Sequence, residues 1–554
     1  MNDPGRVNIA AALTEMAAQQ PYTPAIMVPQ GRDGLGNVAY THYTYRQLDQ
    51  QSDFIARGLE QIGIGRGVKT ALMVKPSLEF FALTFAIFKA GAVPILIDPG
   101  IGTKSLKTCL AEAEPAAFIG IPKAHLARVL LGWSRSTIKT LVTVGGWRWL
   151  WGGHTLAEVR ALGESEEPYE PPATRGDEMA AIVFTSGSTG IPKGVIYRHG
   201  QFVQQVKMLR EMLGIEPGEI DLPCFPLYAL FDPALGMTTV VPDMDFTKPA
   251  HVDPRNIVEP IEDFGVTNLF GSPSLLNTVG RWGAERGVEL PTLRRVISNG
   301  APVSAAVQER FSQMLGDGVE VVTPYGATEA LPVCTIGSGE ILSETAARTE
   351  QGAGVCVGRP VAPTEVAIIR IDDGAIERWD EALRVPDGEV GEITVRGPTV
   401  TREYHARPEQ TALAKIVDGD TFWHRMGDLG YFDDRGRVWF CGRKVHRVET
   451  AAGPLFAVRC EGIFNRHPEV YRSALVGVSR DGEVEPAICI ELEPGVASSE
   501  HGRLRDELLA LGATVEMTAG IRSVLFHPGF PVDIRHNAKI HREQLGEWAQ
   551  GRSG

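Results

Sequence analysis

Positively charged residues are scarce relative to acidic ones in this chain. Of its 554 residues, 54 are Lys or Arg and 68 are Asp or Glu, which gives a formal net charge of −14. A nucleic-acid-binding protein needs a basic face, and no block of Lys and Arg provides one. The composition therefore excludes nucleic acid as an expected partner. With 43% hydrophobic residues, it is typical of a globular protein with large cores.

Cysteine is also sparse, and its spacing offers no metal motif. The seven cysteines include no Cys-x-x-Cys pair, and their odd number argues against a complete disulfide framework. Zinc sites and secreted disulfide scaffolds are thereby disfavoured, and a reducing cytoplasm is the expected compartment.

No apolar run reaches the length of a membrane span. The most apolar stretch, residues 80–98, is interrupted by Lys89 and Pro94, whereas a transmembrane helix needs about 20 continuous apolar residues. The first 20 residues lack the basic region and apolar core of a signal peptide, and we expect an amphipathic helix there. The sequence thus predicts a cytoplasmic protein without a transmembrane segment.

What the chain does contain is an alternation of short apolar strands and amphipathic helices. Residues 69–75 and 92–98 look like strands, and between them we expect a helix that begins after Ser77 and stops at Gly91. A strand–helix–strand unit is typical of a parallel sheet. Residues 292–315 repeat the pattern, with Pro302 expected in the first turn of the helix. The predicted fold class is therefore α/β.

Residues 388–398 and 436–444 look like antiparallel strands with glycine turns. Beyond them, about 110 residues have a strand–helix pattern of their own, which predicts a second, smaller unit at the C-terminal end. Residues 163–178 are acidic and rich in proline, which predicts an exposed linker. We expect a domain boundary near Arg443, with an N-terminal domain over residues 1–443 and an α+β domain over residues 444–554.

Residues 180–200 carry glycines, hydroxyls and one lysine between two apolar runs. The Walker phosphate-loop spacing fails, because Gly187 and Gly190 are only three residues apart and no hydroxyl residue follows the Lys-Gly pair. Pro192 and the β-branched run beyond it predict a strand–loop–strand hairpin. Hydroxyls, glycine N–H groups and Lys193 can still bind phosphate oxygens. A glycine-rich surface hairpin without a ligand is the alternative.

The segment TSGSTGIPKG closely resembles the phosphate loop of the adenylate-forming (ANL) superfamily, which includes acyl-CoA synthetases, luciferases and peptide-synthetase adenylation domains. Further family motifs follow in the same order along nearly the whole chain: SNGAP from Ser298, YGATE from Tyr325, MGDLG from Met426, CGRK from Cys441 and PVDIRHNAKIHRE from Pro531. The resemblance implies a large adenylate-forming domain, made of α/β subdomains and a small β-barrel-like part. A mobile C-terminal lid with a catalytic lysine would follow it.

The same resemblance implies ATP and Mg²⁺ as cofactors and gives roles to individual residues. Lys539 matches the catalytic lysine, and Lys193 would add charge beside the phosphates. Glu329 would hold Mg²⁺ and Thr328 would approach the α-phosphate. Asp428 would accept hydrogen bonds from the ribose hydroxyls. The residues implied in ATP binding are Thr185, Ser186, Gly187, Ser188, Thr189, Gly190, Lys193, Gly300, Ala301, Pro302, Tyr325, Gly326, Thr328, Asp428 and Arg443.

Each of these residues has a plainer interpretation when it is taken alone. Asp428 could be a turn residue, Glu329 a charge at a helix start and Lys539 one exposed lysine among many. His536 and His541 are expected at the surface, because no third metal ligand stands near them in sequence. These interpretations do not account for the ordered series of motifs.

The chain departs from acyl-CoA ligases where a thiol acceptor would bind. The hinge position two residues after Arg443 is Val445 rather than Asp or Lys, and VHRVETAAGPLFAV replaces the usual glycine turn. With segments such as FPLYALFDPALG, the chain looks like the olefin β-lactone synthetases of bacterial long-chain hydrocarbon biosynthesis. That resemblance implies adenylation of a long-chain 2-alkyl-3-hydroxy fatty acid, followed by attack of its own 3-hydroxyl to give a β-lactone. It also implies assembly with other enzymes of the olefin pathway.

The expected acyl pocket lies beside Tyr228, Leu230, Phe231, Gly271, Ser272, Leu331 and Pro332, for which plain core packing is the alternative. His446 is a candidate base for the 3-hydroxyl, and a surface histidine is its alternative. Two other functions stay open. One is a fatty acyl-CoA ligase or acyl-AMP ligase with CoA or a carrier thiol as acceptor. The other is a non-catalytic adenylate-binding or scaffold protein.

Overall fold

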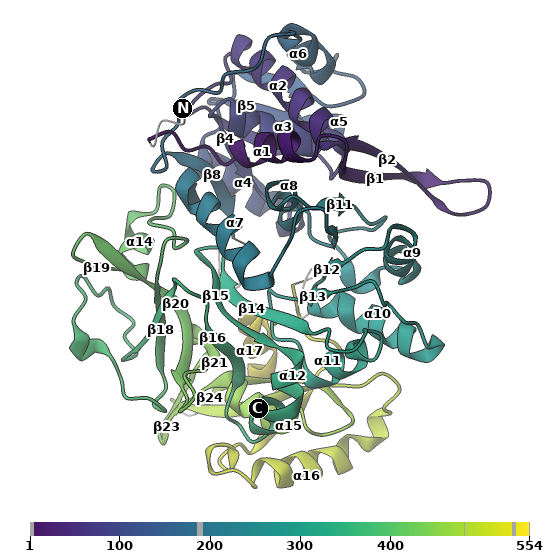
Figure 1. Ribbon diagram of the computed structural model, residues 1–554. Coiled ribbons are helices and arrows are strands. Elements are labelled where there is room, and N and C mark those ends of the chain that lie inside the picture. Colours follow the sequence, from purple (N-terminus) through teal and green to yellow (C-terminus); the bar gives the residue numbers. More distant parts are fainter. Residues whose placement is uncertain (1–4, 186–191, 481, 534–538, 553–554) are drawn as a thin grey trace.

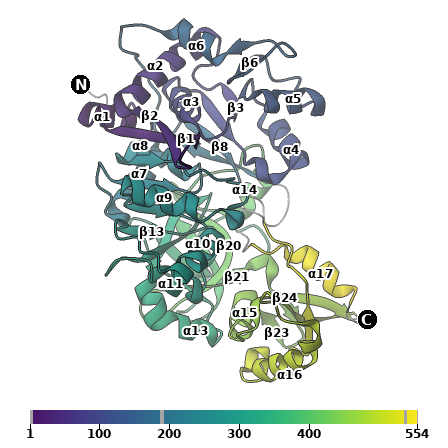
Figure 2. The ribbon, with the colours of Figure 1, turned by 90° about the vertical axis from the view of Figure 1, so that its right-hand side faces the viewer.

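The computed structural model describes residues 5–552 except 186–191, 481 and 534–538. Figure 1 shows three zones along the molecule. A sheet with the first helices forms the upper part, a second sheet crosses the middle, and the C-terminal residues form the lower edge. Figure 2 shows the C-terminal residues beside the second sheet.

The first sheet has seven strands in the order β7-β6-β5-β3-β4-β8-β9. All neighbours are parallel except β8 and β9. The strands span Lys69–Met73 (β3), Val93–Leu96 (β4), Ala117–Gly120 (β5), Thr140–Thr143 (β6), His154–Thr155 (β7), Met179–Phe184 (β8) and Gly194–Arg198 (β9). The helices that accompany this sheet are α1 (Ala11–Gln19), α2 (Tyr45–Gln61), α3 (Leu78–Lys89), α4 (Thr103–Ala113), α5 (Pro122–Leu131) and α6 (Leu156–Gly163).

Two local predictions are confirmed in this sheet. The succession β3-α3-β4 is the expected strand–helix–strand unit: the Ser77 hydroxyl accepts a hydrogen bond from the Phe80 N–H, and Gly91 beyond the helix has φ of +65°. The antiparallel pair β8 and β9 flanks the glycine–hydroxyl segment, as the strand–loop–strand prediction requires. Residues 186–191 of that segment lie outside the described residues.

The second sheet has 14 strands and changes character along its length. Its parallel part consists of β1 (Pro24–Arg32), β10 (Ile220–Pro223), β11 (Thr238–Val240), β12 (Asn268–Phe270), β13 (Arg295–Ile297) and β14 (Val321–Ala327), with β2 (Val38–Thr44) antiparallel at the edge. Its antiparallel part consists of β15 (Ala330–Gly337), β16 (Val355–Pro360), β17 (Glu365–Ile369), β18 (Gly391–Arg396), β19 (Lys415–Asp418), β20 (Thr421–Phe432) and β21 (Val438–Arg443).

The helices of this region correct one prediction. They are α7 (His199–Leu213), α8 (Asp232–Leu235), α9 (Arg255–Phe264), α10 (Pro273–Arg286), α11 (Ala305–Ser312), α12 (Ser338–Glu340), α13 (Ala346–Glu350) and α14 (Pro408–Ala414). Pro302 is not in the first turn of α11, so that prediction was wrong. The Ser304 hydroxyl caps α11 by accepting from the Val307 N–H, which leaves Pro302 in the preceding turn.

The C-terminal residues have hydrophobic cores of their own. Their strands are β22 (Val448–Thr450), β23 (Gly453–Leu455), β24 (Val470–Arg480), β25 (Glu483–Leu492) and β26 (Ser523–Phe526), and their helices are α15 (Ala457–Phe464), α16 (His501–Gly512) and α17 (Arg542–Gln550). α15 packs against β21 and α13. A short 3₁₀ turn, Lys444–His446, connects β21 to this part.

The apolar stretch of residues 80–98 lies inside the protein, in α3 and β4. None of the helices in the described part of the chain combines the length and apolar character that crossing a bilayer requires. All seven cysteines are buried free thiols, in agreement with the absence of a disulfide framework.

One buried ion cluster fastens α3 to α2. Lys89 is only 2% exposed, and its Nζ lies 2.7 Å from Asp49 Oδ1 and 2.5 Å from Asp53 Oδ1. Burial raises the pKa of Asp53, while the Lys89 ammonium opposes that rise. The Lys89 charge thus offsets the repulsion between two neighbouring half-buried carboxylates and part of the cost of burying them.

The variant Lys89→Met is expected to lose roughly 2–3 kcal/mol of stability near neutral pH, because it leaves two carboxylates without their cation. The pKa of Asp53 would rise further. Between the ordinary pKa of an Asp carboxyl in the unfolded chain and this raised pKa, the native state would hold a proton that the unfolded state has released. The free energy of unfolding of the variant therefore falls as pH rises through that range. Thermal unfolding should therefore show a larger loss at pH 7.5 than near pH 5 (about one unit above the ordinary carboxylate range). An equal loss at both pH values would contradict this account.

Candidate active site

A cavity of about 1550 Å³ lies where the two sheets and the C-terminal residues meet. Its walls include loops that follow β12, β13 and β14 and residues near the ends of β20 and β21. Lys539, Ile540 and Arg542 line it from the C-terminal part. The predicted site residues that line it are Thr185, Lys193, Gly300, Ala301, Pro302, Tyr325, Gly326, Thr328, Glu329, Asp428, Arg443 and Lys539. Ser186, Gly187, Ser188, Thr189 and Gly190 lie outside the described residues.

One end of the cavity holds a tyrosine–aspartate–arginine group. The Tyr325 hydroxyl donates to Asp428 Oδ2 at 2.6 Å, and Arg443 Nη1 lies 3.1 Å from Asp428 Oδ1. Burial and the nearby carboxylate hold the pKa of Tyr325 well above its usual value. Asp428 Oδ1 is buried and accepts no hydrogen bond from the described residues, although Arg443 is its ion-pair neighbour. Such a buried acceptor fits a ligand that brings hydroxyl donors, as a ribose does.

Thr328 and Glu329 occupy the turn between β14 and β15. The Tyr197 hydroxyl donates to the Thr328 carbonyl at 2.5 Å. The Glu329 carbonyl accepts from both the N–H and the hydroxyl of Thr401, at 2.8 and 3.1 Å. The Tyr404 hydroxyl donates to Glu329 Oε1 at 2.7 Å. The turn is therefore held in place from the outside, by residues far along the chain.

Thr401 and Tyr404 belong to residues 397–407, which we call the crossing segment. This segment also forms hydrogen bonds with the first sheet. The Ile196 N–H donates to the Glu403 carbonyl, and the His405 N–H donates to the Gly194 carbonyl at 2.7 Å. Arg198 forms an ion pair with Glu403 at 2.7 Å. The crossing segment thus joins β9, which follows the glycine–hydroxyl loop, to the turn that carries Glu329.

Two half-buried lysines stand beside this segment. Lys193 Nζ lies 5.0 Å from the centre of the Tyr404 ring, and burial lowers its pKa while Glu329 opposes the shift. Lys415 donates to the Thr401 carbonyl, and burial lowers the pKa of Lys415 to about 7. Tyr404 therefore contacts both Lys193, through its ring, and Glu329, through its hydroxyl.

Neither Tyr404 nor Lys415 was among the residues predicted from the sequence. Tyr404 donates to Glu329 from a position 75 residues later in the chain, and Lys415 donates to the neighbouring Thr401 carbonyl. Neither residue stands in a recognisable sequence motif. The only sequence signal is a tyrosine followed by Pro408 in a polar loop, which is common at the surface of many proteins.

The other end of the cavity is apolar and aromatic. Of the expected acyl-pocket residues, Tyr228, Leu230, Phe231, Ser272 and Leu331 line it, while Gly271 and Pro332 do not. Gly271 packs closely against α10, because a Cβ at this position would lie only 2.9 Å from the Leu275 side chain. The sequence reasoning missed further aromatic members of this wall, which are Phe88, Phe202, Phe225, Phe246 and Phe270.

The aromatic wall is fixed by ring stacking and by one polar contact. Tyr228 stacks on Phe270 with centroids 4.2 Å apart, and Asn299 Nδ2 donates to the Tyr228 hydroxyl at 2.6 Å. Burial raises the pKa of Tyr228 to about 12, so its hydroxyl stays protonated at neutral pH. Phe202 stacks on Tyr197 at 4.7 Å and thereby connects this wall to the Thr328 turn.

His446 also lines the cavity, in the 3₁₀ turn after β21. Its Nε2 lies 3.5 Å from Glu543 Oε1, and burial together with Arg542 lowers the pKa of His446 to about 4. The imidazole is therefore neutral at pH 7. Its side chain is mostly buried, unlike the surface histidine that was the alternative.

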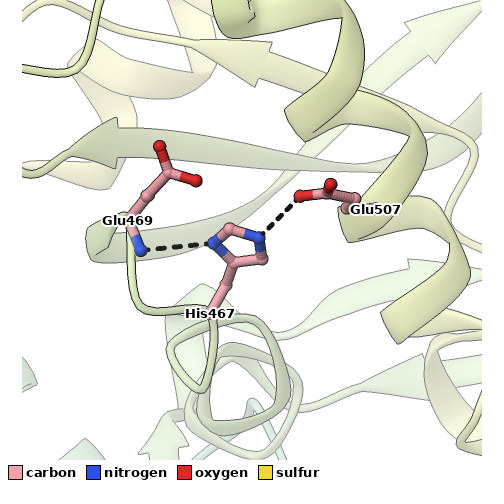
Figure 3. Close-up of side chains that lie close together, drawn as sticks. All are labelled: His467, Glu469 and Glu507. Atoms are coloured by element: carbon pink, nitrogen blue, oxygen red, sulfur yellow. Dashed lines mark hydrogen bonds and ion pairs between the residues drawn. The ribbon is translucent and has the colours of Figure 1, made fainter.

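A second cluster of ligand-type side chains lies in the C-terminal part, and none of its three members lines the cavity. His467, Glu469 and Glu507 come close together there (Figure 3). His467 Nε2 lies 3.0 Å from Glu507, and His467 Nδ1 accepts from the Glu469 N–H. Arg503 forms ion pairs with both glutamates at 2.8 Å. The arginine already balances the two carboxylates, so the cluster is an ion-pair network rather than a metal centre.

Comparison with known proteins agrees with this geometry. A family model described as AMP-binding enzyme matches residues 13–405. The chain is 53% identical to the olefin β-lactone synthetase of Xanthomonas campestris pv. campestris and 53% identical to that of Stenotrophomonas maltophilia, and in each case 99% of both chains is covered. ATP-bound MatB from Rhodopseudomonas palustris has a similar fold, with a TM-score of 0.80, 21% identity, and coverage of 99% of this chain and all of that one.

The variant Tyr404→Phe tests the positioning of Glu329. It keeps the ring beside Lys193 and removes only the hydroxyl that orients the carboxylate. The loss of one hydrogen bond to a charged group should raise the Mg²⁺ concentration for half-maximal ATP turnover by roughly tenfold. Titration of Mg²⁺ in a pyrophosphate-release assay measures this.

Tyr431→Phe is the matched control, because the Tyr431 hydroxyl donates to the Ala353 carbonyl outside the cavity. It should leave the Mg²⁺ titration unchanged. A Tyr404→Phe curve that overlays the wild-type curve would refute the positioning role.

Proposed function

This chain belongs to the AMP-binding enzyme family, and we propose that it is an ATP- and Mg²⁺-dependent ligase that converts a long-chain 2-alkyl-3-hydroxy fatty acid into a β-lactone. The carboxylate is first activated as an acyl-adenylate. The 3-hydroxyl of the same molecule then displaces AMP.

The observation that carries the proposal is the 53% identity to two olefin β-lactone synthetases over 99% of each chain. That similarity includes both the N-terminal residues and the C-terminal part. The arrangement of the cavity supports it independently. The polar end of the cavity carries side chains that can bind phosphate oxygens, and it adjoins an apolar end suited to alkyl chains.

The polar end suits a nucleotide triphosphate. The buried Oδ1 of Asp428, which accepts no hydrogen bond from the described residues, would accept a ribose hydroxyl, and Tyr325 beside it would stack on adenine. Lys193 and Arg443 line the same space and supply positive charge. Glu329 would hold Mg²⁺ through its carboxylate, and the ion when bound would neutralise phosphate oxygens.

The first step makes the carboxylate reactive. A carboxylate oxygen of the fatty acid attacks the α-phosphorus of ATP, the bond to the β-phosphate oxygen breaks, and pyrophosphate leaves. Such phosphoryl transfers need positioned charge more than covalent help. Lys539 lines the cavity from the C-terminal part, so we assign it to the negative charge between carboxylate and α-phosphate.

The second step forms the ring. The 3-hydroxyl oxygen attacks the acyl carbon, the acyl–phosphate bond breaks, and AMP leaves with the electron pair. The hydroxyl proton passes to solvent or to the neutral His446 imidazole. Because nucleophile and carbonyl belong to one molecule, no second substrate needs a channel, and the high effective concentration offsets part of the ring strain.

We further propose that residues 444–554 act as a mobile lid over this chemistry. They carry Lys539 into the cavity and have separate cores. Besides the packing of α15 on β21 and α13, their contacts with the rest of the chain include the ion pairs of Lys444 with Glu392 at 3.1 Å and of Arg447 with Asp373 at 2.6 Å. A closed lid would keep water from the acyl-adenylate. Assembly with other olefin-pathway enzymes remains a proposal that rests on the family resemblance.

The variant Lys539→Ala is expected to lower pyrophosphate release by at least about a hundredfold, since it removes one charge that stabilises the transition state. ATP binding, measured by calorimetry, should survive. Lys207→Ala is the matched control, because Lys207 is 65% exposed on α7. Unchanged pyrophosphate release in Lys539→Ala would overturn the assignment.

The product distinguishes the proposal from its alternatives. With a synthetic 2-alkyl-3-hydroxy acid, ATP and Mg²⁺, mass spectrometry should find a product that lacks one water relative to the acid. Its formation should not depend on CoA. A strict CoA requirement with a thioester product would identify an acyl-CoA ligase instead, and the absence of pyrophosphate release would leave only a binding or scaffold role.

A further inference from the structure

The charges of this acidic chain are distributed unevenly along the sequence. Residues 115–157 contain no Asp or Glu, although the whole chain has 68 of them. The same stretch contains five basic residues, which are Lys123, Arg128, Arg135, Lys139 and Arg148. In the fold it comprises β5, α5, β6 and the loop to β7, at one edge of the first sheet. Arg128 is buried and Arg148 forms an ion pair with Glu158 of α6 at 2.5 Å, so Lys123, Arg135 and Lys139 supply the exposed positive charge of this edge, on a protein whose net charge is −14.

The loop between β6 and β7 adds exposed aromatic side chains to this edge. It reads GGWRWLWGG from Gly145, and four of the nine tryptophans of the chain lie within residues 115–157. Trp149 is 76% exposed, Trp147 45% and Leu150 47%. Side chains of this size are rarely left in water without a partner, because their burial contributes much of the stability of cores and interfaces.

The loop is held in a defined shape despite its exposure. Trp151 stacks on His125 of α5 with centroids 5.0 Å apart, and its indole N–H donates to the Thr143 hydroxyl at 2.9 Å. Trp147 lies 5.0 Å from Trp151 and 5.6 Å from Trp149. Trp151 is thus an anchor, and the two outer indoles are presented outward from it.

Helix α5 continues the same kind of surface. Leu130 and Leu131 at its C-terminal end are 72% and 40% exposed. The exposed basic residues Lys123, Arg135 and Lys139 stand at its start and on the segment that follows it. Figure 2 shows α5, β6 and α4 together at one side of the first sheet, away from the C-terminal residues.

We propose that this surface, formed by Trp147, Trp149, Leu150, the end of α5 and the nearby lysines and Arg135, docks the protein on an anionic lipid bilayer. Tryptophan side chains settle at the boundary between headgroups and acyl chains, and basic residues are drawn to negatively charged headgroups. A peripheral attachment of this kind needs no membrane-spanning helix.

Charge and side-chain type favour lipid over a protein partner. A protein interface of ordinary size has a polar rim with charges of both signs, whereas here a stretch of 43 residues from 115 to 157 carries only positive formal charge. The docking surface also goes beyond the proposed function. It would bring the enzyme to the phase into which a substrate with long alkyl chains partitions, but it does not depend on which reaction the cavity performs.

Sedimentation with vesicles tests the proposal on the full-length protein without substrate. The probes are phosphatidylcholine vesicles with and without phosphatidylglycerol. The protein should sediment with the anionic vesicles, and salt should weaken that binding. No sedimentation with anionic vesicles would overturn the proposal, as would equal sedimentation with both kinds.

Three variants locate the surface. The double variant Trp147→Ser/Trp149→Ser should weaken vesicle binding by at least about tenfold, because it removes the two inserted rings. Lys123→Gln/Lys139→Gln should weaken binding by about fivefold for each charge removed and flatten its salt dependence. Tyr22→Ser is the matched control, since Tyr22 is as exposed as Trp149, at 76%, but precedes β1 outside the basic stretch.

Thermal unfolding and pyrophosphate release with a soluble short-chain acid show that the variants are folded and active. Both should be unchanged, because none of the substituted residues lines the cavity. Undiminished vesicle binding of the tryptophan variant would refute the surface. So would wild-type protein that ignores vesicles yet binds a second protein through these tryptophans. The vesicle result and the product assay are separate, so either proposal can fail alone.

Discussion

The site depends on the hydrogen bonds that the crossing segment makes to the turn at Glu329. Thr401 holds the backbone of that turn with two donors, and Tyr404 holds its carboxylate. The same segment pairs with β9 of the first sheet, so one short stretch connects the two sheets exactly where their loops face the cavity. Buried backbone groups that are satisfied twice in this way resist displacement, because breaking them leaves polar atoms without water. Tyr404 also lies 5.0 Å from Lys193 Nζ through its ring, so the same residue of the crossing segment contacts both Lys193 and Glu329.

Basic and acidic side chains line the cavity together. Lys193, Arg443 and Lys539 lie there with the carboxylates of Glu329 and Asp428. Burial lowers the pKa of Lys193, the Glu329 carboxylate opposes that shift, and the nearby Arg407 and Arg443 charges add to it. A polyphosphate bound beside these cations would favour the charged form of Lys193.

Sequence predicted the parts of the fold that depend on local pattern, and it failed where distant segments meet. Ser77, Gly91 and the runs around the glycine–hydroxyl loop carry local signals, so α3, β4, β8 and β9 were recognisable. Pro302 was placed in a helix because the rule for prolines at helix starts competed with the Ser304 cap two residues later. Tyr404 and Lys415 could not be found, because their roles come from contacts across the second sheet. The motif residues themselves were named from family resemblance, which carries spatial information that one sequence does not.

The geometry also bears on why a four-membered ring could form here. Attack by a neighbouring hydroxyl needs no catalytic thiol and no approach path for a second substrate, only an acyl chain held still beside the phosphate end of the cavity. Tyr228 and Phe270 form a stacked wall at the apolar end of the cavity, and Phe202 connects that wall to the Thr328 turn through Tyr197. Val445, at the connection to the C-terminal part, is 62% exposed and apolar, whereas Lys444 and Arg447 beside it form ion pairs with Glu392 and Asp373. A substrate that carries its own acceptor would place its demands on the wall that holds the acyl chain, and the proposed lid would then serve mainly to exclude water.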